Sequence, residues 1–429
     1  MYNTGLHILK QGHTEGHDMG RAYEATHPWL TYKLDLRSAS PRLWVALGEA
    51  QSKCYHIGGV PLRPDIAEDM HKIYLARGLL ATTAIEGNTL TEKEVRAIVD
   101  NESKLPSSRE YLGKEIESVL AAFNSILKDV EMGQIKPLTP TLVQDYNTTV
   151  LRNLKLDTGI APGKIRDYPV GVGLYRGAPF EDCEYLLQRL CNWLNSNDFE
   201  APNKEDRVIY GLIKSIVAHV YLAWIHPFGD GNGRTARLLE AKFLLEAGVP
   251  SAAAHLLSNH YNLTRTEYYK QLENTSLSQG NLLPFIEYAV AGFVDQLREQ
   301  IETIRIQQVL VSWVNYVHEK LSQKTPSGRR QLHVVLAMSD KSGYIKKSDI
   351  RQLTAQIAAE YATKTYKTLT RDLNRLKKLD LIESGIGGYQ AKIATMLAFL
   401  PSSIDQKVPI AKPIGKPEES QTGQLTLGL

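Results

Sequence analysis

The residues best suited to chemistry lie in one unbroken stretch, His226-Pro227-Phe228-Gly229-Asp230-Gly231-Asn232-Gly233-Arg234-Thr235-Ala236-Arg237. Pro227 is expected to end the preceding helix, because proline disrupts helical hydrogen bonding. The residues Gly231, Asn232 and Gly233 predict a turn with positive φ angles that exposes successive backbone N–H groups. A new helix is expected to open near Gly233, and N–H groups at a helix N-terminus bind anions.

Four polar side chains surround this predicted anion site. Arg234 and Arg237 are three residues apart on the first turn of the new helix, where two permanent charges suit phosphate oxygens. Asp230 is a hard carboxylate that could hold Mg²⁺ bridging phosphates. The ordinary pKa of a histidine side chain, about 6.5, would suit His226 to act as a general base. Together these residues predict polyphosphate binding and phosphoryl or nucleotidyl transfer.

Other interpretations of the same stretch fit less well. Residues 231–236 have the spacing of a dinucleotide-binding loop, but a predicted helix precedes them where that loop follows a strand, and the chain has no P-loop sequence. Asp-Gly-Asn-Gly alone would indicate a turn or a weak calcium loop. Phe228 is expected to be an apolar peg that seats the loop.

The stretch 226–237 resembles the active-site motif of the Fic (Fido) domain family, His-Pro-Phe-x-Asp/Glu-Gly-Asn-Gly-Arg-x-x-Arg, at every defined position. The resemblance extends over most of 64–300. It implies transfer of AMP from ATP to a Ser, Thr or Tyr hydroxyl of a target protein, which could be the chain itself, with pyrophosphate leaving. Gly233 supports AMP transfer, because family members that phosphorylate instead carry Lys at that position.

The resemblance also implies a role for each motif residue. His226 would deprotonate the target hydroxyl, and Asp230 would hold Mg²⁺ on the α and β phosphates. The backbone N–H groups of Gly231, Asn232 and Gly233 would form a cradle for the phosphates. Arg234 would assist them, and Arg237 would contact the γ-phosphate.

Two further segments would line the nucleotide. Residues 162–173 predict a β-hairpin that resembles the family's flap, which pairs with the target segment by strand addition; its nucleotide-side residues would be Val170, Gly171, Val172 and Gly173. A plain structural hairpin is the alternative. Tyr268 and Tyr269 resemble the tyrosines on the adenine side, although on pattern alone at least one could belong to the core. The Asn that commonly follows in relatives is Ser276 here, with Asn274 nearby, which leaves the adenine contacts open.

An inhibitory element is predicted upstream of the motif. Thr82, Glu86 and Gly87 fit the family's inhibitory sequence Ser/Thr-x-x-x-Glu-Gly/Asn. A carboxylate delivered to Arg237 would form a charge-assisted pair and occupy the place of the γ-phosphate. The resemblance is therefore to the self-inhibited class with an N-terminal inhibitory helix. The alternative is an ordinary helix end with Glu86 in solvent.

Two other functions remain open at the level of sequence. The same site could remove AMP as a phosphodiesterase, with Glu86 aligning a water. A DNA-binding regulator is suggested by residues 329–398, which carry 13 Lys or Arg and six Asp or Glu. A helix near 364–375 places Lys364, Lys367, Arg371 and Arg375 at spacings of three and four. A solvated face used for protein contacts or dimerisation is the alternative.

The elements that must position these residues are mainly helical. The expected fold is a Fic/Fido helical core with a small β-hairpin flap, followed by a winged-helix domain. Capping boxes are expected at Ser107 and Thr91, and a cap before a first-turn proline at Thr139. Helices are expected near 64–84, 92–100, 108–132, 140–153, 181–195, 204–225, 233–247, 264–275 and 281–323.

Five regions are expected along the chain. They are an N-terminal region with the inhibitory helix (1–105), the catalytic domain (106–300), a connecting helix (301–328), the winged-helix domain (329–398) and a disordered tail (399–429). The tail is rich in Pro, Lys, Gln, Ser and Thr and poor in apolar residues.

The amino-acid composition limits the class of protein. The chain has 429 residues, 43% of them hydrophobic and 23% charged, which is typical of a folded protein of several domains. Its net charge of +3 does not indicate a nucleic-acid or membrane binder overall. Three cysteines without C-x-x-C spacing support neither a disulfide framework nor a zinc site. With no apparent signal peptide or membrane span, a cytoplasmic protein is expected, and a homodimer is possible.

Overall fold

The computed structural model describes residues 20–172 and 175–397, and within them the chain is mainly helical, as predicted. The first twelve helices are α1 (Ala22–Thr26), α2 (Pro41–Gly59), α3 (Pro64–Ala84), α4 (Glu92–Val99), α5 (Glu110–Glu131), α6 (Pro140–Val150), α7 (Cys183–Leu194), α8 (Arg207–Ile225), α9 (Asn232–Glu246), α10 (Leu256–Leu263), α11 (Arg265–Leu277) and α12 (Leu283–Lys320). The C-terminal elements are α13 (Pro326–Ser339), α14 (Ala355–Ala362), α15 (Tyr366–Lys378), β3 (Ile382–Gly385) and β4 (Gly388–Ala391). The predicted tail, 399–429, lies outside the described residues.

Local capping explains several helix starts. Thr91 and Glu94 form the predicted capping box of α4, and Thr139 caps α6 ahead of Pro140. The capping box expected at Ser107 is wrong. Ser107 begins a short 3-10 turn after Pro106, and α5 starts three residues later without a side-chain cap.

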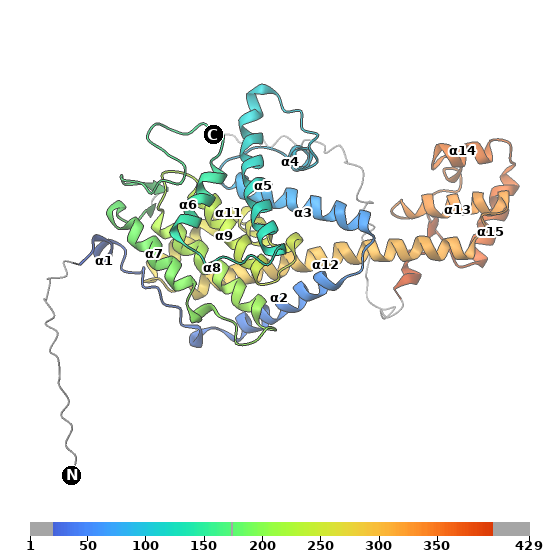
Figure 1. Cartoon of the computed structure of the whole chain (residues 1–429). Coiled ribbons are helices and arrows are strands. Elements are labelled where there is room, and N and C mark those ends of the chain that lie inside the picture. Colours follow the sequence, from blue (N-terminus) through green and yellow to red (C-terminus); the bar gives the residue numbers. More distant parts are fainter. Residues whose placement is uncertain (1–19, 173–174, 398–429) are drawn as a thin grey trace, which may run out of the picture.

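Helix α8 lies within the helical body and packs along α9 (Figure 1). It is long and apolar enough by composition to cross a membrane, but 78% of that apolar window is buried. Its buried residues include Leu212, Ile216 and Trp224, which form one core with α2, α7 and the first half of α12. These contacts are those of a core helix. A neighbouring core joins α3, α4 and α5 to the second face of α9.

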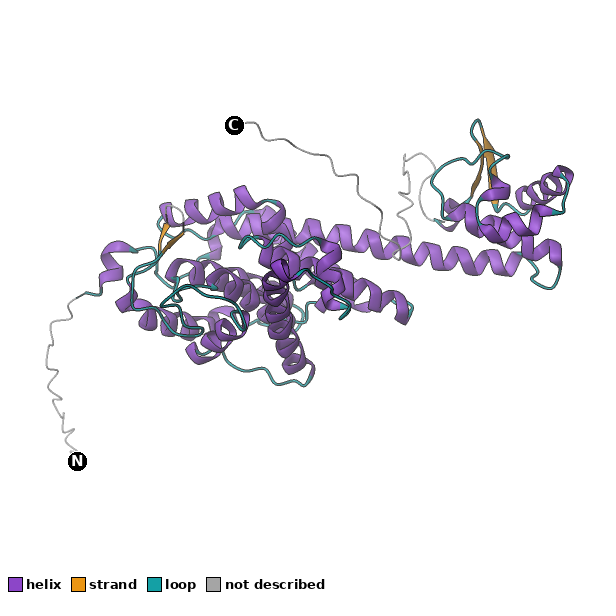
Figure 2. Ribbon diagram, turned by 90° about the horizontal axis from the view of Figure 1, so that it is seen from above, coloured by secondary structure: helices purple, strands orange, loops and turns teal. Residues whose placement is uncertain are grey.

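A third core lies at the C-terminal end, where α13 to α15 and the β3–β4 hairpin pack together (Figure 2). Trp313, Val317 and Leu321, at the end of α12, belong to this core. Part of the predicted connecting helix, 301–328, thus contributes side chains to this core. One continuous 38-residue helix, α12, joins that unit to the body.

Candidate active site

The motif begins where α8 stops, at a residue in a strained conformation. His226 follows the last residue of α8 with φ 51° and ψ 56°, in the left-handed region that non-glycine residues seldom adopt. Buried Arg166 holds it there: Nε of Arg166 donates to the His226 carbonyl oxygen at 2.7 Å, and its backbone N–H donates to Pro227 at 3.0 Å. This turn directs the imidazole out of the helical bundle and into a cavity.

The loop after His226 closes on its own backbone. Asn232 accepts a hydrogen bond from the Phe228 N–H at 3.0 Å and donates to the Phe228 carbonyl at 2.8 Å. Phe228 is 1% exposed, which confirms the predicted apolar peg. Of the three residues expected at positive φ, only Gly231 has one, 76°. Asn232 and Gly233 already form the first turn of α9, so the helix opens one residue earlier than predicted.

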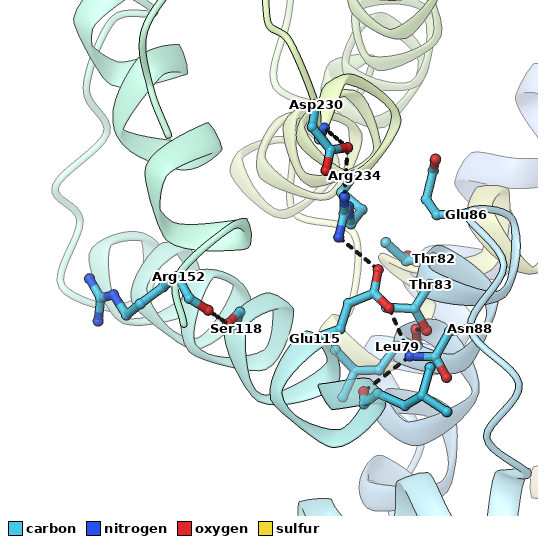
Figure 3. Close-up of polar contacts among 12 residues, drawn as sticks. Leu79, Thr82, Thr83, Glu86, Asn88, Glu115, Ser118, Arg152, Asp230 and Arg234 are labelled. Carbon is cyan, nitrogen blue, oxygen red and sulfur yellow. Dashed lines mark hydrogen bonds and ion pairs between the residues drawn. The ribbon is translucent and has the colours of Figure 1, made fainter. Parts of the chain in front are cut away.

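Arg234 connects the loop to a neighbouring helix (Figure 3). Its Nη2 donates to Oδ1 of Asp230 at 2.9 Å, and its Nη1 donates to Oε1 of Glu115 on α5 at 2.7 Å. Glu115 also accepts from the side-chain amide of Asn88 at 2.8 Å. Burial raises the pKa of Glu115, and the charge of Arg234 opposes that shift. Four polar side chains thus form a chain from Asp230 to the segment just after Glu86.

Arg237 faces the end of α3. Its Nη2 contacts Oε1 of Glu86 and donates to the Thr82 carbonyl oxygen at 2.9 Å. The Arg237 side chain is 1% exposed and that of Glu86 is 33% exposed. Burial raises the pKa of Glu86, but the charge and hydrogen bond of Arg237, together with the charges of Arg234 and His226, outweigh it, and the net pKa lies below the ordinary value. The carboxylate is therefore charged where it meets the arginine.

The turn that carries Glu86 is fixed on both sides. Gly87 has φ 102°, a conformation that favours glycine at a helix end. From α11, Nη1 of Arg265 donates to the Ala84 carbonyl at 3.1 Å, and Nη2 contacts that of Ile85. On the catalytic side, Gly233 leaves space for the carboxylate, because a Cβ atom there would lie 2.2 Å from Oε1 of Glu86.

Some of these residues line a cavity of about 1090 Å³. His226, Gly233, Arg237 and Glu86 form one end of it, while Asp230 and Arg234 lie outside its lining. The volume lies slightly above the range of about 300–1,000 Å³ that is typical of sites for drug-sized ligands and cofactors. Its lining exposes more apolar than polar surface, which suits a flat aromatic base beside charged groups.

The flap forms a smaller hairpin than predicted, and it starts later. Strand β1 (Gly171–Val172) pairs with β2 (Tyr175–Arg176), whereas Ile165, in the first half of the expected hairpin, pairs with Phe228. That half is taken up by the contact with the motif loop. Val170 and Gly171 are not among the cavity's lining residues, which instead include Pro169 and 175–179. Gly173 and the side chain of Val172 lie outside the described residues.

The two tyrosines on α11 differ in environment. Tyr268 is 4% exposed, and its hydroxyl lies 2.8 Å from Nε2 of His219. Nδ1 of that histidine lies 3.2 Å from the Glu240 carboxylate. Tyr269 is 42% exposed. Both rings border the cavity, as does Ser276, so Tyr268 combines a core position with a place in the cavity wall.

The environment of His226 suits a base. Desolvation lowers its pKa below the ordinary value of 6.5, and the positive charge of Arg166 adds to this effect. The Ala223 carbonyl and the charge of Glu86 act in the opposite direction without reversing it. The imidazole is therefore neutral near neutral pH and able to accept a proton.

Asp230 offers a cation one carboxylate beside the predicted phosphate cradle. Its side chain is 40% exposed, and Arg234 forms an ion pair with it. Within 20–172 and 175–397 no group of three or more His, Cys, Asp or Glu residues is arranged to hold a metal. This pattern fits Mg²⁺, which usually takes one or two carboxylates and completes its shell with substrate oxygens and water.

The sequence profile of the Fic/DOC family matches residues 137–244. This chain carries a Fic/DOC family domain. The matched residues contain the whole His226–Arg237 stretch, whereas Glu86 and Arg265 lie outside them. The predicted limits of the catalytic domain, 106 and 300, enclose the match and remain predictions.

Curated relatives of this chain are named protein adenylyltransferases. The chain is 29% identical over 276 residues to protein adenylyltransferase fic-1 of Caenorhabditis briggsae, covering 62% of this chain and 49% of that protein. It is 28% identical over 246 residues to protein adenylyltransferase Fic of Nematostella vectensis, covering 56% and 52%. The chain thus spans about half the length of these relatives.

Solved structures share the Fic fold. A Fic family protein from Desulfovibrio desulfuricans G20 superposes with a TM-score of 0.51 at 20% identity, covering 84% of this chain and 98% of that one. Residues 134–508 of Fic-1 from C. elegans superpose with a TM-score of 0.50 at 23% identity, covering 61% and 73%. These likenesses support the predicted mainly helical Fic fold.

Several residues that shape this Fic site were not predicted from the sequence. They are Asn88, Glu115, Asn147, Arg166 and Arg265. Asn147 binds the Asp230 carbonyl at 2.9 Å, across 83 residues of sequence. All of them except Asn88 act on the motif or the inhibitory turn from a distant segment, so no local spacing marks them. The run Glu86-Gly87-Asn88 offered the one weak signal, a turn-forming Asn beside the inhibitory sequence.

Proposed function

We propose that this chain is a protein adenylyltransferase that moves AMP from ATP to a Ser, Thr or Tyr hydroxyl of a target protein. The observation that carries the proposal is the convergence of His226, Gly233 and Arg237 on one cavity at the start of α9. The names of the curated relatives support transfer over removal of AMP.

The chemistry follows from the arrangement. The target hydroxyl gives its proton to His226, and its oxygen forms a bond to the α-phosphorus of ATP as the bond to the β-phosphate oxygen breaks. Pyrophosphate leaves with that electron pair. Backbone N–H groups at the start of α9 and the Arg234 guanidinium orient the phosphates. Mg²⁺, held by Asp230, would neutralise phosphate charge when bound.

The proposal includes self-inhibition. Glu86 is charged, lies against Arg237 and borders the same cavity. While Glu86 is there, the arginine cannot receive the γ-phosphate, and ATP binds in a pose that does not suit in-line attack. The target protein and a homodimer remain predictions.

The test is incorporation of label from ATP labelled at the α-phosphate. Glu86→Gly and Glu86→Gln should raise incorporation well above wild type, and adding His226→Ala should abolish it. Glu102→Gln, at an exposed residue away from the cavity, is the matched control and should behave as wild type. Unchanged incorporation in both Glu86 variants would refute the inhibitory role, and activity that survives His226→Ala would refute the base.

The product identifies the reaction. Mass spectrometry of a lysate incubated with the Glu86→Gly variant should show an added AMP on Tyr, Thr or Ser. If the variant only strips AMP from modified proteins, the direction proposed here is wrong.

A further inference from the structure

The outer face of α15 carries three exposed basic side chains. Leu369, Asp372, Leu373 and Leu376 face the C-terminal core and are buried. The opposite face carries Lys367, Arg371 and Lys378, spaced four and seven residues apart and all exposed. At 100° per residue these three side chains lie within about 40° of one another around the helix axis. They form a single stripe.

No acidic residue offsets this stripe on the helix itself. Asp372, the one acidic residue between Tyr366 and Lys378, is 4% exposed. It accepts hydrogen bonds from Arg330 at 2.8 Å, Gln331 at 2.7 Å and the Tyr361 hydroxyl at 2.8 Å. The stripe residues form no ion pair within the described part of the chain. Their charge is available to an external anion.

Helix α15 is connected to its neighbours as the second helix of a helix-turn-helix unit is. Helices α14 and α15 are joined by a turn of three residues, Thr363 to Thr365, which is the length found in helix-turn-helix units. In such units the second helix enters the major groove of DNA. The β3–β4 hairpin packs next to α15, and Lys377 of the helix donates to Ser384 of β3 at 2.8 Å. The hairpin turn exposes Ile386 completely.

We propose that the outer face of α15 binds duplex DNA, with the basic stripe on the phosphates flanking a major groove. The stripe extends about 16 Å along the helix axis, from Lys367 to Lys378. With α15 lying across the groove, that length would reach phosphates on both sides of a groove about 12 Å wide. Residues 329–398 carry a net charge of +7, whereas the whole chain carries +3, so the electrostatic attraction is concentrated in this unit.

The test is fluorescence anisotropy of the full chain with a labelled mixed-sequence duplex of about 20 base pairs, between about 50 and 200 mM salt. The triple variant Lys367→Gln, Arg371→Gln, Lys378→Gln should weaken binding at least about tenfold. It should also reduce the salt dependence by about one phosphate contact for each residue replaced. A triple that exchanges Lys for Arg and Arg for Lys at the same positions should retain binding.

A matched control removes the same charge elsewhere. Lys93→Gln, Lys104→Gln, Lys128→Gln neutralises three exposed lysines of the body, and it should bind DNA as wild type does. The proposal is overturned if the wild-type chain does not bind duplex at low salt, if both triples weaken binding equally, or if a single-stranded RNA or an acidic protein binds this face in preference. Combined with Glu86→Gly, both triples should incorporate AMP equally, so DNA binding and enzyme activity are read separately.

Discussion

Arg265, the first residue of α11, donates to the carbonyl oxygen of Ala84, the last residue of α3, at 3.1 Å. The same guanidinium contacts the next carbonyl, that of Ile85. A cation at the C-terminus of a helix stabilises it by satisfying free carbonyl groups. Here it fixes the turn that presents Glu86 to Arg237, and its Cζ lies 6.0 Å from the ring centre of Tyr269. The tyrosine side of the cavity and the inhibitory turn therefore share one arginine.

Arg265→Gln should release part of the inhibition. A hydrogen bond from a charged donor is worth about 1.5 kcal/mol, so losing the equivalent of one such bond should raise the share of chains with Glu86 away from Arg237 by roughly tenfold. AMP incorporation should rise accordingly, but less than in Glu86→Gly. The matched control is Arg207→Gln, which removes a similar contact to the Glu246 carbonyl at the end of α9. If the control activates as strongly, Arg265 has no specific role.

Glu115→Gln should reduce both stability and rate. Arg234 and Glu115 are 7% and 12% exposed at their side chains, and breaking a buried pair costs about 3 kcal/mol. In the Glu86→Gly background we expect a lower kcat, because Arg234 loses one of the two carboxylates that orient it. Urea unfolding and single-turnover kinetics measure the two effects. Glu110→Gln, at the exposed start of the same helix, should change neither. A full-rate Glu115→Gln enzyme would contradict the positioning role.

Tyr268→Phe should destabilise the fold more than Tyr269→Phe. The first removes the hydroxyl 2.8 Å from Nε2 of buried His219 and leaves that nitrogen without a partner, at a cost of about 1–3 kcal/mol. The Tyr269 ring is 42% exposed, so its substitution should cost less than about 0.5 kcal/mol. Urea denaturation of the two variants tests this, and equal midpoints would show that the His219 contact contributes nothing.

The activity of Glu86→Gly should persist into mildly acidic solution. Desolvation lowers the pKa of His226 below its ordinary value of 6.5, so the neutral imidazole survives to a lower pH. Activity should fall only as the pH drops through that lowered pKa, when the protonated ring can no longer accept a proton. Removing Glu86 removes a charge that raises this pKa and should extend the range further. An acid limb of kcat/KM centred above pH 7 would argue against His226 as the base.

The sequence predicted features that depend on local spacing. The limits of α3, the caps at Thr91 and Thr139, and the Phe228 peg each follow from residues a few positions apart, and each is confirmed. Helix α2 was missed, although Ser40 and Pro41 form a capped start like that of α6. The predicted flap begins too early in the sequence. The turn residues and the short alternation of apolar and polar residues at 162–170 are the same whether the segment pairs with itself or with Phe228.

Contacts between distant segments could not be predicted in the same way. Glu115 and Arg234 are 119 residues apart, and Ala84 and Arg265 are 181 apart. A lone glutamate on an amphipathic helix, or an arginine at a helix start, is ordinary in any single sequence. Their partners are defined only once α5 packs against α9 and α11 lies beside the end of α3. The motif could be recognised, but the residues that hold it in place required the structure.

Because α12 is one continuous helix, it fixes how the C-terminal unit is rotated about the axis of α12. The Gln308 side chain donates to the Pro61 carbonyl of the body, and the next residue, Val309, already packs against the C-terminal core. The helix therefore passes directly from the body to the C-terminal unit. One residue inserted at this junction would rotate the C-terminal unit by about 100° about the helix axis and shift it by about 1.5 Å along that axis. Seven inserted residues would nearly restore the original rotation and shift the unit by about 10 Å. Helical phase at this point, more than linker length, decides which way the basic stripe faces relative to His226.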